Sequence, residues 1–109
     1  MSDCLFCKIA AKEIPSKIVR ETPDWVAFRD IQPQAPTHIL LVPRQHLATV
    51  NELDPATAAT LIEGAQSVAK EEGLSSYRLV FNCGSEAGQS VWHVHLHLLG
   101  GRTMHWPPG

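Results

Sequence analysis

Three histidines at alternate positions, His93, His95 and His97, are the residues of this chain whose types and spacing most clearly suggest chemistry. A period of two is typical of a β-strand, so we expect the three imidazoles to share one face of a strand over Val91–Leu99. The apolar residues between them would then bury the opposite face. The histidine face must meet water, a metal, a ligand or other hydrogen-bond partners, because unpaired polar groups are costly to bury.

Two functional interpretations of the run compete. Alternate residues rise by roughly 6.5 Å along a strand, which puts the outer two histidines about 13 Å apart. Metal–nitrogen bonds are only about 2 Å long, so one ion is not expected to hold all three rings. In the other interpretation His95 is a nucleophile toward phosphorus, and its neighbours orient it or bind metal. A merely packed or solvated histidine patch is the third possibility.

A second candidate site is the pair Cys4 and Cys7, which are separated by two residues. This spacing is typical of zinc ligands, although a closed tetrahedral site needs two more. A reduced, unligated pair is the alternative. A redox motif is disfavoured because no parallel βαβ pattern surrounds the cysteines.

A glycine-containing polar loop, Gly84–Ser90, precedes the histidines. Glycine permits close backbone approach, and concave sets of amides bind anions, so Gly88, Gln89, Ser90 and Val91 are candidates to present N–H groups to a phosphate. The Ser90 hydroxyl can also relay a proton to a departing group. Without that role it is an ordinary loop serine.

One long helix is expected over residues 55–72. Asp54 suits the N-cap, Pro55 the first helical position and Gly73 the position after the helix. Leu61, Ala65 and Val68 fall on one face of this helix.

The remaining elements are shorter. Turn residues and β-branched or aromatic runs predict strands over residues 18–20, 25–28, 38–42, 77–83 and 91–99 and a short helix over residues 5–12. Residues 31–36 read as a loop, and a tail begins at Gly100. This order predicts an α+β fold in which an antiparallel sheet of about five strands packs on the long helix, with a short N-terminal helix. We expect residues 1–109 to form one domain.

Composition excludes several classes of protein. The formal net charge of −2 provides no basic field for a nucleic-acid polymer. The longest apolar run, Ile39–Val42, is too short to cross a bilayer. Met1–Cys4 does not resemble the start of a signal peptide, and the cysteine usage suits a reducing compartment, so a cytoplasmic location is expected.

The histidine run also has the pattern His-φ-His-φ-His-φ-φ, where φ is apolar, and it resembles the signature of the histidine triad (HIT) family. The similarity covers nearly the whole chain and is closest to the Hint branch, the purine nucleoside phosphoramidases. Beyond the triad it is carried by Phe28–Ile31, Pro36–His38, Pro43–His46, Gly88–Val91 and the tail Gly100–Gly109.

The resemblance implies roles for individual residues. His95 would attack the α-phosphorus and form a nucleotidyl-histidine intermediate. His97 and His38 would hold its tautomer and stabilise charge, and Ser90 would assist departure of the leaving amine. Asp30 would accept both ribose hydroxyls, which suits the two oxygens of a carboxylate.

Other residues keep two interpretations. Asn82 resembles a family asparagine near the phosphate, but it would equally cap a strand end. Three apolar residues resemble the walls around the purine, and each would equally be plain core: Phe6, Ile14 and Ile31.

The resemblance also implies a structural zinc and a dimer. By the family match, His46 and His93 complete a Cys₂His₂ set with Cys4 and Cys7. This zinc would steady the N-terminal segment and would not be the catalyst. A two-fold homodimer is implied, in which the tail approaches the partner's active site.

The function implied is hydrolysis of purine nucleoside 5′-phosphoramidates or acyl-adenylates, with release of AMP or GMP. A dinucleotide polyphosphate hydrolase is one alternative, but that branch usually has glutamine at the position of His97. A nucleotidyl transferase would have a His-Pro-His core, and Val94 disagrees with it. A zinc-stabilised nucleotide-binding or partner-regulating module without turnover is the alternative from another class.

Overall fold

One antiparallel sheet with strand order β1-β2-β3-β5-β4 forms the centre of the computed structural model, which describes residues 3–109. The strands are β1 (Ile18–Glu21), β2 (Trp25–Arg29), β3 (Thr37–Pro43), β4 (Tyr77–Val80) and β5 (Leu96–Gly100). The predicted α+β fold with a five-stranded antiparallel sheet is therefore confirmed. Met1 and Ser2, which we assigned to the same domain, lie outside the described residues.

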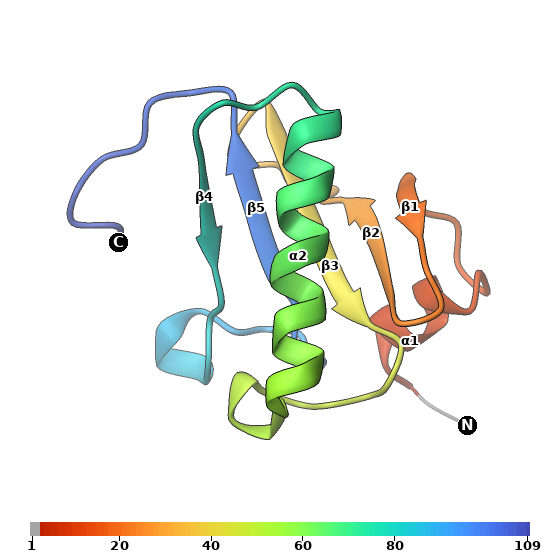
Figure 1. Ribbon diagram of the computed structural model, residues 1–109. Helices are drawn as coiled ribbons and strands as arrows, with labels where there is room; N and C mark the ends of the chain where they lie inside the picture. The colour runs from red at the N-terminus through yellow and green to blue at the C-terminus, as the bar shows by residue number, and fades with distance from the viewer. Residues whose placement is uncertain (1–2) are drawn as a thin grey trace.

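The long helix α2 (Pro55–Glu71) lies across one face of the sheet (Figure 1). The Asp54 side chain caps it by accepting from the N–H of Thr57, as the sequence predicts. Its buried face contributes Leu61, Ala65 and Val68 to the core. Gly64 lies on the same face, and the structure explains why a glycine stands there. A Cβ at this position would lie 2.7 Å from the Trp25 ring.

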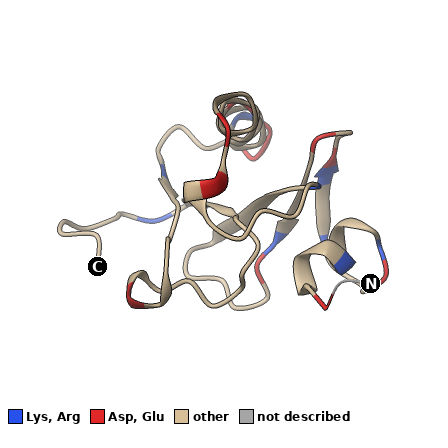
Figure 2. Ribbon diagram, turned by 90° about the horizontal axis from the view of Figure 1, so that it is seen from below, with Lys and Arg blue, Asp and Glu red and all other residues tan. Residues whose placement is uncertain are grey.

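The short helix α1 (Leu5–Ala10) covers part of the opposite face (Figure 2), where Phe6 and Ile9 pack against side chains of β2 and β3. Alternate residues of these two strands point to different helices. Ala27 and Leu41 belong to the core under α2, whereas Phe28 belongs to the core under α1. Both faces being buried explains why these strands read as continuous apolar runs.

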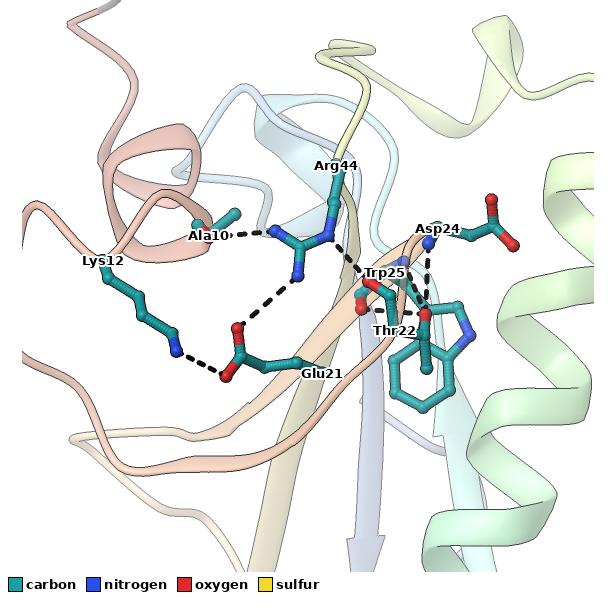
Figure 3. Close-up of polar contacts among 7 residues, drawn as sticks. All are labelled: Ala10, Lys12, Glu21, Thr22, Asp24, Trp25 and Arg44. Atoms are coloured by element: carbon teal, nitrogen blue, oxygen red, sulfur yellow. Dashed lines mark hydrogen bonds and ion pairs between the residues drawn. The ribbon is translucent and has the colours of Figure 1, made fainter.

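Arg44, directly after β3, fastens α1 to the sheet (Figure 3). Its guanidinium donates to the carbonyl oxygen of Ala10 at 3.1 Å and to that of Thr22 at 2.7 Å. It also lies 3.5 Å from a carboxylate oxygen of Glu21, whose other oxygen pairs with Lys12 at 2.8 Å. A six-residue helix is too short to persist by itself, so tertiary contacts of this kind fix its position.

The largest departure from the predicted elements concerns the histidine run. The predicted strand Val91–Leu99 is wrong at its start, because β5 begins at Leu96. The chain before Leu96 does not pair with β3, and the N–H of Val94 instead donates to the carbonyl of Leu47 at 2.7 Å. His93 and His95 therefore precede the strand, and only His97 lies within it.

Smaller differences lie at element ends. The predicted strand 77–83 ends at Val80, and the helix 5–12 ends at Ala10. Two short 3₁₀ helices, Val50–Glu52 and Ser85–Ala87, were not predicted. No helix within residues 3–109 has the length and apolar character needed to span a membrane.

Candidate active site and metal centre

A cavity of about 390 Å³ lies between α1, the β2–β3 loop and the segment Gly88–Val91. Its volume is in the range of small-molecule sites. Many of the residues predicted for the site line it, namely Phe6, Ile14, Asp30, Ile31, Gly88, Ser90, Val91, His95 and His97. A second cavity of about 600 Å³ adjoins it, shares Asp30 and Ile31, and includes His38.

The proton of neutral His95 is fixed on one ring nitrogen. Its Nδ1 lies 2.8 Å from the backbone oxygen of His93. Because a carbonyl only accepts, Nδ1 must carry the proton, and Nε2 keeps a free lone pair. Burial lowers the pKa of His95 below the ordinary 6.5, which keeps the ring neutral. The expectation that His97 and His38 hold the tautomer of His95 is wrong, because the backbone carbonyl of His93 fixes the proton on Nδ1.

His38 and His97 form a separate relay. The N–H of Gln34 donates to Nδ1 of His38 at 3.0 Å, so the proton of neutral His38 is on Nε2. That atom lies 2.9 Å from Nδ1 of His97, which must accept. We therefore assign the proton of His97 to its Nε2 from this network.

The Nε2 of His97 is the one buried side-chain nitrogen or oxygen within residues 3–109 that lacks a hydrogen-bond partner. Leaving a buried donor unpaired costs about 1–3 kcal/mol. Burial, followed by the nearby rings of His95 and His38, lowers the pKa of His97 to about 4. The site thus offers one free acceptor on His95 and one free donor on His97.

Asp30 borders both cavities and is half-buried. One carboxylate oxygen accepts from the N–H of Gln32 at 2.8 Å, and the other lies 3.5 Å from Nε2 of His38. The carboxylate therefore has lone pairs left for a ligand, and it favours the proton position assigned to His38.

The glycine loop offers fewer amides than expected. The N–H of Gly88 donates to Ser85, and the N–H of Gln89 donates to Gly84, both at 3.0 Å. The expectation that these two amides face a phosphate is therefore wrong, because the 3₁₀ turn uses them. Among the hydrogen bonds of residues 3–109, none occupies the N–H of Ser90 or Val91.

Gln89 has a structural role instead. Its buried side chain donates to the carbonyls of Ala48 and Val91 and accepts from the N–H of Gly84. The residue thus ties the loop to the segment after β3. Asn82 lies close to the loop, with its amide nitrogen 3.8 Å from the point where a Cβ on Gly88 would stand.

The three apolar candidates differ in position. Phe6 is only 5% exposed and belongs to the core, yet it also lines the cavity and meets the His95 ring edge-on at 4.9 Å between centroids. Ile14 is half-buried against the same core. Ile31 is 92% exposed at the cavity rim, so the alternative that it is plain core is wrong.

Cys4, Cys7, His46 and His93 form a compact cluster in which all four ligand atoms lie within 4.8 Å of one another. The two Nδ1 atoms are 3.3 Å apart, and three sulfur–nitrogen distances are 3.3, 3.4 and 3.4 Å. Tetrahedral zinc with ordinary bond lengths requires about 3.3 Å between nitrogens and about 3.6 Å between sulfur and nitrogen. The donor set and its spacing therefore fit zinc.

His93 is oriented for this cluster by the backbone. Its Nε2 donates to the carbonyl of Pro43 at 2.7 Å, so Nδ1 is the unprotonated atom that faces the cysteines. The carbonyl of the same residue holds His95. His93 thus connects the metal cluster to the cavity, and neither Pro43 nor Gln34 was identified from sequence, because each acts through a backbone atom.

Comparison with known proteins relates the chain to one family. The HIT domain family model matches residues 11–104. A 14 kDa zinc-binding protein of Zea mays is 50% identical over 114 residues, which span 99% of this chain and 89% of that protein.

Solved structures agree with the fold. A HIT family hydrolase from Legionella pneumophila Philadelphia 1 superposes with a TM-score of 0.95 at 54% identity, over 98% of this chain and 100% of that one. A zinc-bound histidine triad family protein from Mycobacterium smegmatis gives a TM-score of 0.85 at 26% identity, over 98% of this chain and 80% of that one.

We predict that His97 stays neutral in the folded protein until the pH approaches about 4. The unfolded chain, with a histidine pKa near 6.5, binds more protons between these values. The contribution of His97 to the free energy of unfolding is therefore complete above about pH 6.5 and is lost as the pH falls toward 4. Ring NMR titration measures the pKa directly, and a midpoint near 6.5 would contradict the prediction. In His97→Gln, this part of the acid dependence of unfolding should vanish.

Proposed function

The chain belongs to the HIT domain family, and on that basis we propose that it is a hydrolase that cleaves purine nucleoside 5′-phosphoramidates or acyl-adenylates and releases AMP or GMP. The observation that carries the proposal is the bond from Nδ1 of His95 to the carbonyl of His93, because it leaves Nε2 unprotonated in the cavity. A neutral imidazole with one free nitrogen is a competent nucleophile near neutral pH.

In the proposed reaction Nε2 of His95 forms a bond to the α-phosphorus, and the bond from phosphorus to the leaving nitrogen breaks. The leaving amine keeps the electron pair and takes the proton of the Ser90 hydroxyl, which in turn takes one from solvent water. Water then bonds to phosphorus, the electron pair of the phosphorus–imidazole bond returns to Nε2, and the attacking water releases one proton to solvent. AMP or GMP departs with the neutral ring restored.

The free donor on His97 suits the charge that develops in this reaction. Its Nε2–H is buried and unpaired within the described residues, so a non-bridging phosphate oxygen would satisfy it. The unused amides of Ser90 and Val91 are further donors on the same cavity. Asp30, which lines both this cavity and the second one, would accept the ribose hydroxyls, and Phe6, Ile14 and Ile31 would flank the purine.

The surroundings of Ser90 favour an amine over a polyphosphate as leaving group. Ser90 lines both the main cavity and a hollow of about 510 Å³ next to the metal cluster. Asp3 and Trp92 line that hollow, and no lysine or arginine of the described chain does. A polyphosphate leaving there would meet no fixed cation, which disfavours the dinucleotide alternative.

We predict that the protein releases AMP from an adenosine phosphoramidate and that His95→Ala abolishes release while AMP affinity, measured by calorimetry, changes little. Ser90→Ala should slow the phosphoramidate by about 10²-fold, because the amine loses its proton relay. The same variant should slow an acyl-adenylate much less, since a carboxylate leaves without a proton.

Ser85→Ala is the matched control, because Ser85 is an exposed serine of the same loop that lines none of the three hollows described here. Release that survives in His95→Ala would eliminate the nucleophile. Tight AMP binding without any turnover in the native protein would establish the binding-module alternative instead.

We also propose that the Cys₂His₂ cluster holds one structural zinc per chain. The fit of the donor spacing and the orientation of His93 by Pro43 support it. Bound there, zinc would join the N-terminal segment to the segments that follow β3 and precede β5, and it would take no part in the bond changes.

Elemental analysis of purified protein should find about one zinc per chain. Cys4→Ser and Cys7→Ser should lose it and lower the midpoint of thermal unfolding, because binding free energy contributes to folding. Cys83→Ser is the control, since Cys83 is not in the cluster. Zinc-free native protein, or equal zinc content in all three variants, would refute the site.

The homodimer that the resemblance implies is also a proposal. β4 is an edge strand of the sheet, and edges of this kind are open to pairing. The tail runs beyond β4 (Figure 1), where Arg78 donates to the carbonyl of His105 at 2.8 Å. We predict a sedimentation mass of twice the 12.0 kDa of one chain. A species of one chain's mass at micromolar concentration would contradict it.

A further inference from the structure

The relay formed by His38 and His97 has two self-consistent proton arrangements, and the rings alone do not choose between them. In the arrangement assigned above, Nε2 of His38 donates to Nδ1 of His97, and Nε2 of His97 is a donor. If the proton of His38 moved to Nδ1, Nδ1–H of His97 would donate to His38, and Nε2 of His97 would present a lone pair. The second arrangement would repel a phosphate oxygen instead of binding it.

Two groups from the β2–β3 loop select the first arrangement. The N–H of Gln34 occupies the lone pair on Nδ1 of His38 at 3.0 Å, and a carboxylate oxygen of Asp30 lies 3.5 Å from its Nε2. Of these, the Gln34 amide makes the shorter contact, and it is useful only while the loop keeps that N–H aimed at the ring. The position of Gln34 therefore determines which ring nitrogens of His38 and His97 carry protons.

The C-terminal tail makes a hydrogen bond to the backbone of Gln34. Arg102 donates through Nε to the carbonyl oxygen of Gln34 at 2.9 Å, and its Nη1 donates to the carbonyl of Thr103 at 3.1 Å. Gly101 allows this approach. It has φ +92°, and a Cβ on it would stand 2.9 Å from Cβ of Pro36 in the same loop. The tail is thus packed directly against the loop that carries the selecting amide.

We propose that Arg102 is a positioning residue, which holds Gln34 so that its amide keeps Nε2 of His97 as a hydrogen-bond donor toward the cavity. Arg102 itself lines neither of the two cavities, and the hydrogen bonds described for it go to Gln34 and Thr103. The catalytic consequence rests on the proposed function, in which that donor binds the phosphate, whereas the proton arrangement of the rings does not rest on it. Through this chain of contacts the C-terminal tail influences chemistry at the base of the cavity.

The test compares Arg102→Gln with Arg102→Lys and with Arg78→Gln. Lysine keeps one charged donor and should restore part of the effect. Arg78 is the matched control, because it also binds a tail carbonyl, but that of His105 instead of a carbonyl in the loop. Nitrogen–proton correlation spectra of the imidazoles distinguish protonated from unprotonated ring nitrogens, and this readout needs neither substrate nor turnover.

In the native protein and in Arg78→Gln we expect a single set of His97 signals with Nε2 protonated. In Arg102→Gln we expect a shift of the averaged ring signals toward Nδ1 protonation, which is partial because Asp30 still favours the original arrangement. With adenosine phosphoramidate, kcat should fall by about tenfold in Arg102→Gln while AMP affinity stays within about twofold. Arg78→Gln should keep its native kcat.

Gly101→Ala provides a second route to the same displacement, because its Cβ would press on Pro36, and it should shift the ring signals in the same direction. Native ring signals in both Arg102→Gln and Gly101→Ala would overturn the proposal. If the native protein cleaves no phosphoramidate but the ring signals shift as expected, the proposed function fails and the positioning role stands. Shifted signals with unchanged kcat would overturn the catalytic consequence alone.

Discussion

A backbone carbonyl can only accept a hydrogen bond, and a backbone amide can only donate one. This constraint fixes the chemistry of four imidazole rings here. The carbonyl of Pro43 makes His93 present Nδ1 to the cysteines, the carbonyl of His93 makes His95 present Nε2 to the cavity, and the amide of Gln34 sets His38 and, through it, His97. Moving the proton of His95 from Nδ1 to Nε2 would set two lone pairs against each other at 2.8 Å and forfeit a bond worth about 1 kcal/mol. In His93 and His95, one ring nitrogen thus binds the backbone carbonyl and the other is left unprotonated.

The histidine run is not a regular strand along its whole length. The carbonyl of His93 accepts from the ring of His95 in the segment before β5. The chain leaves the sheet before Leu96 and is held by the bond from Val94 to Leu47. From Leu96 onward the chain is a strand, and its alternation separates two roles. Leu96 and Leu98 fill the core under α2, while His97 faces the other side.

The sequence predicted those features of the fold and the site that depend on the side chains themselves. Caps and periodicity predicted the capped helix α2 and an antiparallel sheet, although not its strand order. The family resemblance implied His46 and His93 as partners of Cys4 and Cys7, and the structure brings these four residues together. What the sequence could not supply depends on backbone atoms. Nothing in the identity of Gln34 or Pro43 marks the amide or carbonyl that a histidine uses. Gln89 resembled a phosphate contact, yet its side chain fastens the loop and its N–H is used inside a 3₁₀ turn.

The position of α1 makes metal and cavity interdependent. A six-residue helix cannot pay its own nucleation cost, and burial of Phe6 and Ile9 contributes only about 1.5–3 kcal/mol for each side chain. Arg44 secures the end of the helix at Ala10, but its beginning is held through Cys4 and Cys7. Phe6 lies between those cysteines and forms part of the cavity wall beside His95. A metal on the cluster would therefore influence the cavity without lining it, because it would fix both the wall at Phe6 and the carbonyl of His93 that orients the ring of His95.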